Sequence, residues 1–184
     1  MSMQRELVEQ AIRGDHEAFS ELVRLSSRKL YAVATLILRD KTRAEDATQE
    51  ALVAAWRDLS GLRDPDRFDA WLHRVLVREC YREAKRERRR IEVEGQIRPV
   101  TEWSDPSLQN ADRDELERGF ARLPVDQRTV LVLHHYVGYT FPEIAETLGI
   151  PVGTAKSRVN RAVAAMRAAL TADARTTTQG RTSL

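Results

Sequence analysis

Apolar residues recur every three or four positions along most of this chain, a spacing that predicts an almost entirely helical protein. The clearest example is residues 139–170, YTFPEIAETLGIPVGTAKSRVNRAVAAMRAAL. Thr140 and Glu143 have the spacing of a capping box, and Gly149 is a typical left-handed helix stop. The pattern therefore predicts two short helices joined by a tight turn.

The second of these helices has two different faces. One side is apolar, while the opposite side carries Thr154, Lys156, Ser157, Asn160 and Arg161. Arginine and lysine can donate to guanine edges, asparagine can pair with adenine, and the hydroxyl groups can bind bases or phosphates. An ordinary solvated helix has a similar composition, but the capped helix and turn before it favour a DNA-reading helix-turn-helix.

The helical pattern forms two blocks, which predict an all-α fold of two small domains. We expect the first domain over residues 1–91 and the second over residues 112–170. Between them, residues 92–111 contain Gly95, Pro99, Pro106 and several acids, which is typical of a flexible acidic linker. We expect residues 171–184 to be a disordered tail.

Within the first block, Thr42 and Glu45 form a second candidate capping box. A loop at residues 61–67 precedes a long helix that starts near Phe68 and ends in the basic run KRERRR, residues 85–90. Aromatic residues and cations are interleaved along this helix: Phe68, Trp71, Arg74, Arg78, Tyr81, Arg82, Lys85 and Arg86.

Such a mixture suits unpaired nucleic acid, because bases stack on rings while the cations bind phosphates. Core packing is the alternative for the aromatic residues. The spacing of Phe68, Trp71 and Leu72 fits a buried helix face, and composition alone favours that alternative.

Charge and composition narrow the functional classes. The net charge of +2 does not by itself indicate a polyanion-binding protein, but the clustering of basic residues does. Cys80 is the single cysteine, which excludes an intramolecular disulfide and a cysteine-rich zinc site. The sequence has no signal-peptide core and no apolar run of ~20 residues, so we expect a cytoplasmic protein without membrane insertion.

Nothing in the sequence indicates catalysis. His134 and His135 are adjacent, so on a helix they point about 100° apart and cannot face one metal ion together. No metal-binding, phosphate-loop or nucleophile motif is present. We therefore expect a protein that is not an enzyme and that needs no cofactor.

Taken together, the motifs resemble those of the sigma-70 family of bacterial transcription initiation factors, specifically the extracytoplasmic-function (ECF) group. AEDATQEALVAAW (residues 44–56) and FDAWLHRVL (residues 68–76) resemble the sigma-2 domain. LPVDQRTVLVL (residues 123–133), EIAETLG and GTAKSRVNRA resemble the sigma-4 domain. The resemblance covers nearly the whole chain except the linker and the tail.

This resemblance implies three binding surfaces and several partners. The β′ clamp helices of core RNA polymerase would be contacted by Asp46, Gln49, Glu50, Leu52 and Trp56. The loop at residues 61–67 would read the melted −10 non-template strand together with Phe68, Trp71, Arg74, Arg78, Arg82 and Lys85. The −35 duplex would be bound by Thr154, Lys156, Ser157, Asn160 and Arg161, with Arg158 on a phosphate or on another partner. The polymerase β flap and an anti-sigma factor are further implied partners.

One departure from the family pattern concerns the −10 surface. Arg78 and Arg82 stand where the family commonly has Asn and Asp. We expect the added positive charge to strengthen attraction to the DNA backbone and its dependence on salt. The competing interpretation of the whole chain is a duplex-binding repressor or activator with an unrelated helical sensor domain. That interpretation leaves the aromatic and basic helix without a role.

Overall fold

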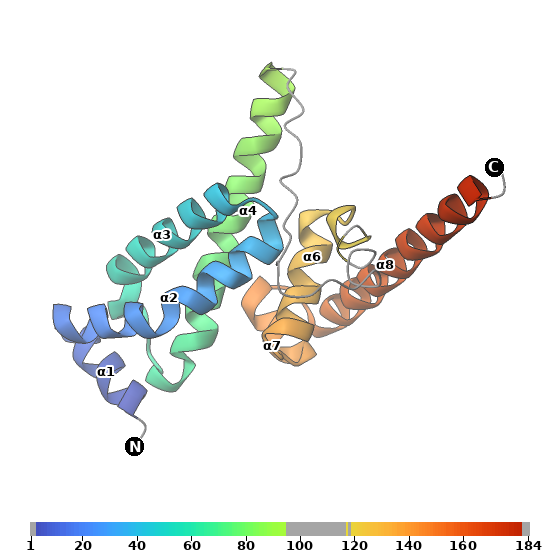
Figure 1. The fold of residues 1–184 in the computed structure, drawn as a ribbon. Helices are drawn as coiled ribbons and strands as arrows, with labels where there is room; N and C mark the ends of the chain where they lie inside the picture. Colours follow the sequence, from blue (N-terminus) through green and yellow to red (C-terminus); the bar gives the residue numbers. More distant parts are fainter. Residues whose placement is uncertain (1–2, 95–116, 118, 182–184) are drawn as a thin grey trace. The chain divides into compact units, whose positions relative to one another are not determined.

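The structure, a computed structural model, describes residues 3–94, 117 and 119–181 (Figure 1). These residues form helices and the turns between them, and no strand occurs among them, which confirms the all-α prediction. The chain divides into two compact units whose main boundary falls within the predicted linker, although Thr147–Gly149 group with the first unit.

The N-terminal unit consists of α1 (Met3–Ile12), α2 (His16–Leu38), α3 (Lys41–Asp58) and α4 (Phe68–Glu94). Two 3-10 turns, η1 (Leu59–Gly61) and η2 (Pro65–Arg67), connect α3 to α4. Alanines at four positions of α3 are fully buried and allow the neighbouring helices to approach closely. The core is completed by larger side chains: Leu22, Leu30, Ile37, Leu59, Phe68 and Leu76.

The start of α3 differs from the prediction. Asp40, not Thr42, is the N-cap, and its carboxylate accepts the backbone N–H of Arg43 at 2.9 Å. Arg39 adopts a left-handed conformation with φ of 54°, so only two residues separate α2 from α3. This tight connection starts the helix at Lys41, and the expected capping box at Thr42 is wrong.

The C-terminal unit contains α6 (Val125–Leu131), the π-helical turn η3 (Val132–Tyr136), α7 (Phe141–Leu148) and α8 (Val152–Arg181). Its described core consists mainly of aliphatic residues from these helices: Val130, Leu133, Ile144, Ala155, Val159 and Ala162. Gly149 has a φ of 65°, which confirms the predicted left-handed stop between α7 and α8.

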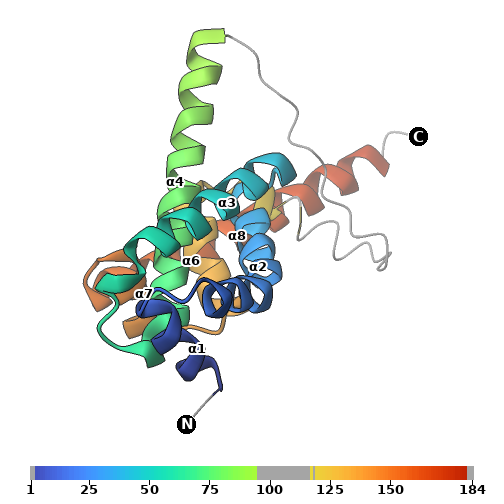
Figure 2. The ribbon, with the colours of Figure 1, turned by 90° about the vertical axis from the view of Figure 1, so that its left-hand side faces the viewer.

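Two helix ends lie beyond their predicted positions. α4 continues to Glu94, and its last turns extend past the ends of α2 and α3 (Figure 2). α8 continues to Arg181. The prediction of a disordered tail is therefore wrong for residues 171–181. Residues 171–179 contain neither glycine nor proline, and nothing in the sequence stops the helix there. Most of the predicted linker lies outside the described residues.

Candidate functional site

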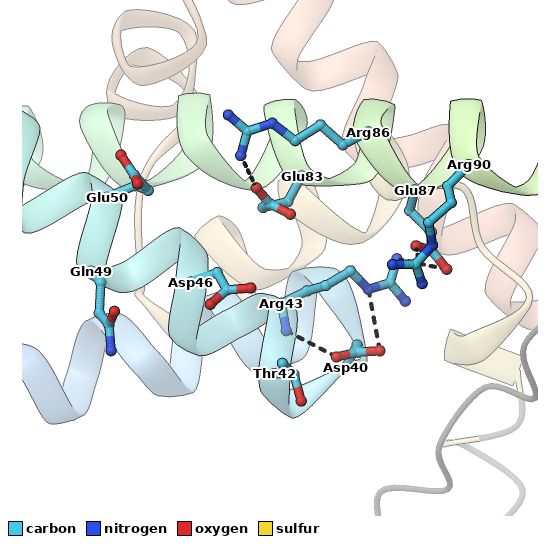
Figure 3. A pocket seen from close by; sticks show the side chains of 10 residues that line it. All are labelled: Asp40, Thr42, Arg43, Asp46, Gln49, Glu50, Glu83, Arg86, Glu87 and Arg90. Carbon is cyan, nitrogen blue, oxygen red and sulfur yellow. Dashed lines mark hydrogen bonds and ion pairs between the residues drawn. The ribbon is translucent and has the colours of Figure 1, made fainter.

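A groove lies between α3 and the C-terminal half of α4 in the N-terminal unit (Figure 3). Its volume is about 380 Å³. Asp46, Gln49 and Glu50, three of the five residues predicted to bind polymerase, line it from α3. The remaining lining residues come from the start of α3 and from α4: Asp40, Thr42, Arg43, Glu83, Arg86, Glu87 and Arg90.

The groove combines fixed ion pairs with an excess of negative charge. Arg86 pairs with Glu83, and Arg90 pairs with Glu87 at 3.2 Å. Arg43 connects the two helices, because it lies 3.2 Å from Asp40 and 3.9 Å from Glu87. The lining contains five carboxylates and three guanidinium groups. This excess of carboxylates suits a partner surface that carries positive charge.

The other two predicted polymerase-binding residues do not line the groove. Leu52 is half-buried on α3. The ring of Trp56 lies 4.6 Å from that of His16 and 4.8 Å from that of Phe19, between centroids, so it packs on α2. Val53 is not among the residues that the sequence predicts for this surface, although it is 63% exposed and follows Gln49 by one helical turn. The four-residue spacing from Gln49 is the sequence feature that could have identified it.

The predicted −10 surface of α4 is only partly exposed. Phe68 is 2% exposed and belongs to the core, so it cannot stack on a base in this structure, contrary to our expectation. Trp71 is half-buried beside it, with 6.1 Å between the ring centroids. The cations of this surface are exposed: Arg74, Arg78, Arg82 and Lys85. The structure therefore supports the core alternative for Phe68 and Leu72, whereas Trp71 remains partly accessible.

The arginines that depart from the family pattern are held by acids. Both oxygens of Glu79, a residue that is 5% exposed, accept hydrogen bonds from Arg82 at 2.8 and 2.9 Å. Arg78 lies 3.4 Å from Glu79 and 3.9 Å from Asp58. Part of their positive charge is thus offset within the protein. The sequence contains the signal, because Glu79 and Arg82 are three residues apart on a helix.

The C-terminal unit contains the predicted helix-turn-helix. The Glu143 carboxylate accepts hydrogen bonds from the hydroxyl of Thr140 at 2.6 Å and from its backbone N–H at 2.7 Å. These bonds lower the pKa of Glu143. They also confirm the reciprocal half of the predicted capping box.

The outer face of α8 presents the predicted DNA-reading residues. Lys156, Ser157, Asn160 and Arg161 are exposed. Thr154 and Arg158 are half-buried at the edge of this face. The Ser157 hydroxyl donates to the Thr154 carbonyl at 3.0 Å, and Arg161 Nε donates to the Ser157 carbonyl at 3.3 Å.

Comparison with known proteins agrees with this arrangement. Residues 22–90 match the model "Sigma-70 region 2", and residues 113–166 match "Sigma-70, region 4". The chain is 32% identical over 157 residues to the ECF RNA polymerase sigma factor SigM of Mycobacterium tuberculosis, covering 85% of this chain and 79% of that protein. It is 31% identical to the RNA polymerase sigma-H factor of Pseudomonas aeruginosa, covering 90% and 93%.

The chain belongs to the ECF group of the sigma-70 family. Two solved structures are similar to this chain. CnrH, solved with the cytosolic domain of CnrY, is 30% identical with a TM-score of 0.68, over 94% of this chain and 99% of that one. RpoE of Bartonella quintana, solved with the anti-sigma factor NepR, is 25% identical with a TM-score of 0.72, over 84% and 98%.

His134 and Cys80 of this sigma factor are held in the packed interior or at its edge and contact other residues of the fold. His134 Nδ1 lies 2.8 Å from the Tyr139 carbonyl oxygen, and its ring stacks on Phe141 at 5.1 Å between centroids. Cys80 is fully buried, and burial raises the pKa of its thiol to about 12. Within the described ranges, no cluster of metal-binding side chains occurs and no helix is long and apolar enough to span a bilayer.

Proposed function

We propose that this ECF sigma factor directs promoter-specific transcription through three separate surfaces. The sigma-2 domain, residues 1–91, binds core RNA polymerase and the −10 strand. The sigma-4 domain, residues 112–170, binds the −35 duplex, and residues 92–111 link the two. The observation that carries the proposal is that one chain combines the α3–α4 groove with the exposed polar face of α8.

The groove is proposed to bind the β′ clamp helices. Asp46, Gln49 and Glu50 provide acceptors along its α3 side, and the excess of carboxylates attracts a basic partner. Val53 adds an exposed apolar side chain next to these polar groups, which gives the surface the mixed character of a protein interface. Trp56 packs on α2 and supports α3 from that side, and Leu52 is half-buried on the same helix.

The −10 strand is proposed to bind along α4 and the loop at residues 61–67. Arg74 and Lys85 are exposed cations for phosphates, and the accessible part of Trp71 can stack on a base. Contacts that form only with separated strands stabilise the open promoter relative to the closed one. The sigma factor thereby favours melting without catalysing a chemical step, and core polymerase performs the phosphoryl transfer.

The −35 duplex is proposed to receive α8 in its major groove. Lys156, Asn160 and Arg161 have donors suited to base edges, while Thr154, Ser157 and Arg158 suit phosphates or the rim of the groove. α7 precedes α8 across the Gly149 turn, as in other helix-turn-helix proteins.

Two further interactions follow from the family. The sigma-4 domain is proposed to contact the polymerase β flap. A protein inhibitor is also proposed, since CnrH was solved with CnrY and RpoE with the anti-sigma factor NepR. Such a partner would compete with polymerase for the same surfaces. We place this activity in the cytoplasm, where core polymerase acts.

The proposal is tested by transcription with purified core polymerase and this full chain on a promoter library. We expect transcripts from a restricted set of promoters that share −35 and −10 sequences. Core polymerase alone should not produce them. Binding to duplex DNA without any polymerase-dependent start site would instead indicate a conventional repressor or activator and would contradict the proposal.

A further inference from the structure

α1 lies outside the region-2 match, which begins at residue 22, yet it is attached to the segment that precedes α4. Arg5 forms an ion pair with Asp66, and it also donates to Glu9 at 3.0 Å. One residue earlier, Gln4 Nε2 donates to Asp69 Oδ1 at 2.8 Å. Two adjacent side chains of α1 thus bind two positions that are three residues apart, on η2 and at the start of α4.

The segment held in this way has a defined shape of its own. The Asp64 carboxylate accepts the backbone N–H of Asp66 at 3.0 Å, and the Asp64 carbonyl accepts that of Arg67 at 3.0 Å. These local bonds form the 3-10 turn η2. They do not fix the turn to the rest of the unit, whereas the bonds from α1 do so.

The ion pair between Arg5 and Asp66 also reduces the negative charge of the segment that precedes α4. Asp64, Asp66 and Asp69 lie within six residues, and all three are exposed. Carboxylates next to a nucleic-acid strand repel its phosphates. The Arg5 guanidinium offsets one of them directly and therefore reduces this repulsion.

We propose that α1 is a positioning element for −10 recognition, in which Arg5 and Gln4 hold the loop at residues 61–67 in the shape that accepts the non-template strand. The inference rests on the proposed function, because it assumes that this loop and α4 bind that strand. Arg5 and Gln4 act through Asp66 and Asp69 and need not touch DNA themselves.

The test uses holoenzyme assembled from core polymerase and the full chain. The DNA probe is a fork junction with a duplex −35 region and a single-stranded −10 non-template segment, taken from a promoter that the library experiment selects. We expect Arg5→Ala to weaken fork-junction binding by about two- to fivefold, within the range for an exposed ion pair. Affinity for core polymerase and for the −35 duplex should not change. The matched control is Arg13→Ala, an exposed arginine just after α1, which should bind like wild type.

Exchanging the charges of Arg5 and Asp66 distinguishes a role in positioning the loop at residues 61–67 from a general effect on folding. Arg5→Asp should weaken fork-junction binding, and the double variant Arg5→Asp, Asp66→Arg, which restores the ion pair with its charges exchanged, should recover most of the loss. Loss of core binding and of thermal stability together in Arg5→Ala would mean that α1 only stabilises the fold, which would overturn the inference.

A Trp71→Ala variant distinguishes the inference from the proposed function. If Trp71→Ala weakens fork-junction binding but Arg5→Ala does not, α1 has no positioning role and the −10 surface remains. If both variants bind the fork junction like wild type, the proposed −10 surface is wrong, and the inference fails with it.

Discussion

Arg82 and Lys85 lie three residues apart on the exposed side of α4, but only Arg82 is paired with a buried acid. Its guanidinium donates to both carboxylate oxygens of Glu79, at 2.8 and 2.9 Å. No ion pair joins Lys85 to any residue in the described part of the chain. The ammonium group of Lys85 is therefore more available to bind a DNA phosphate than the guanidinium of Arg82.

This difference predicts different effects of removing each cation. Lys85→Ala should remove one contact between a cation and a DNA phosphate. The magnitude of the slope of log affinity against log salt concentration, measured for the fork junction, should therefore decrease by about 1. Arg82→Ala should change this slope much less. It should instead lower the free energy of unfolding by ~1–2 kcal/mol, because buried Glu79 loses its bidentate partner. Equal salt slopes for the two variants would contradict the pairing argument.

The groove predicts a charge-dependent affinity for core polymerase. Glu50→Lys places a cation in the carboxylate-rich lining and should weaken core binding at least about fivefold, equivalent to ~1 kcal/mol, with a smaller effect at high salt. Competition binding with labelled sigma factor measures this affinity. Glu45→Lys is the matched control, because Glu45 is exposed on α3 but does not line the groove. A loss of the same size in both variants would assign the effect to net charge rather than to the groove.

Two glycines of the C-terminal unit should respond oppositely to alanine. A Cβ added at either Gly149 or Gly153 would meet no heavy atom within 4 Å, so backbone conformation decides the outcome. Gly149 has a φ of 65°, and Gly149→Ala should lower the free energy of unfolding by ~1–2 kcal/mol. Gly153 lies in the first turn of α8, and Gly153→Ala should raise it by about 0.5–1 kcal/mol. Thermal unfolding monitored by circular dichroism measures both changes, and destabilisation by Gly153→Ala would contradict this assignment.

Buried His73 predicts a loss of stability in weak acid. Desolvation, together with the charge of Lys29 and against the opposing effect of Asp69, lowers the pKa of His73 from 6.5 to about 4. As the pH falls, His73 of the unfolded chain binds a proton near pH 6.5, whereas His73 of the folded chain binds it only near pH 4. The stabilising contribution of neutral His73 to the free energy of unfolding is therefore complete above pH 6.5 and decreases as the pH falls toward 4. In denaturant titrations, His73→Leu should show a shallower fall over this interval than wild type. Parallel curves for the two proteins would contradict the burial argument.

Much of the fold follows from local sequence rules, whereas side-chain partners depend on tertiary contacts. The helical period, the Gly149 stop and the Thr140–Glu143 pair are local features, and the structure contains all of them. Phe68 illustrates the limit, because the same helical spacing suits a stacking face and a core face. Only the packing of α4 against its neighbours makes that residue 2% exposed.

The charged residues of the site show the same limit. Charge type placed Arg82 on a DNA-binding surface, but the structure pairs it with Glu79. The interhelical contact between Arg43 and Glu87, which helps to close the groove, joins residues too far apart in sequence for any local rule to predict. The attachment of Arg5 to Asp66 is of the same kind.

The proposed assignment of −10 melting to the N-terminal unit and −35 binding to the C-terminal unit is tested most directly by permanganate footprinting of the −10 region. The −35 duplex binding is measured alongside, with wild-type, Trp71→Ala and Arg161→Ala holoenzymes. We predict that Trp71→Ala reduces permanganate reactivity and leaves −35 binding unchanged. Arg161→Ala should weaken −35 binding by ~1–3 kcal/mol and leave melting intact once the promoter is saturated with holoenzyme. If each variant impaired both measurements to the same extent, the separation into an upstream duplex-binding unit and a downstream strand-binding unit would be wrong.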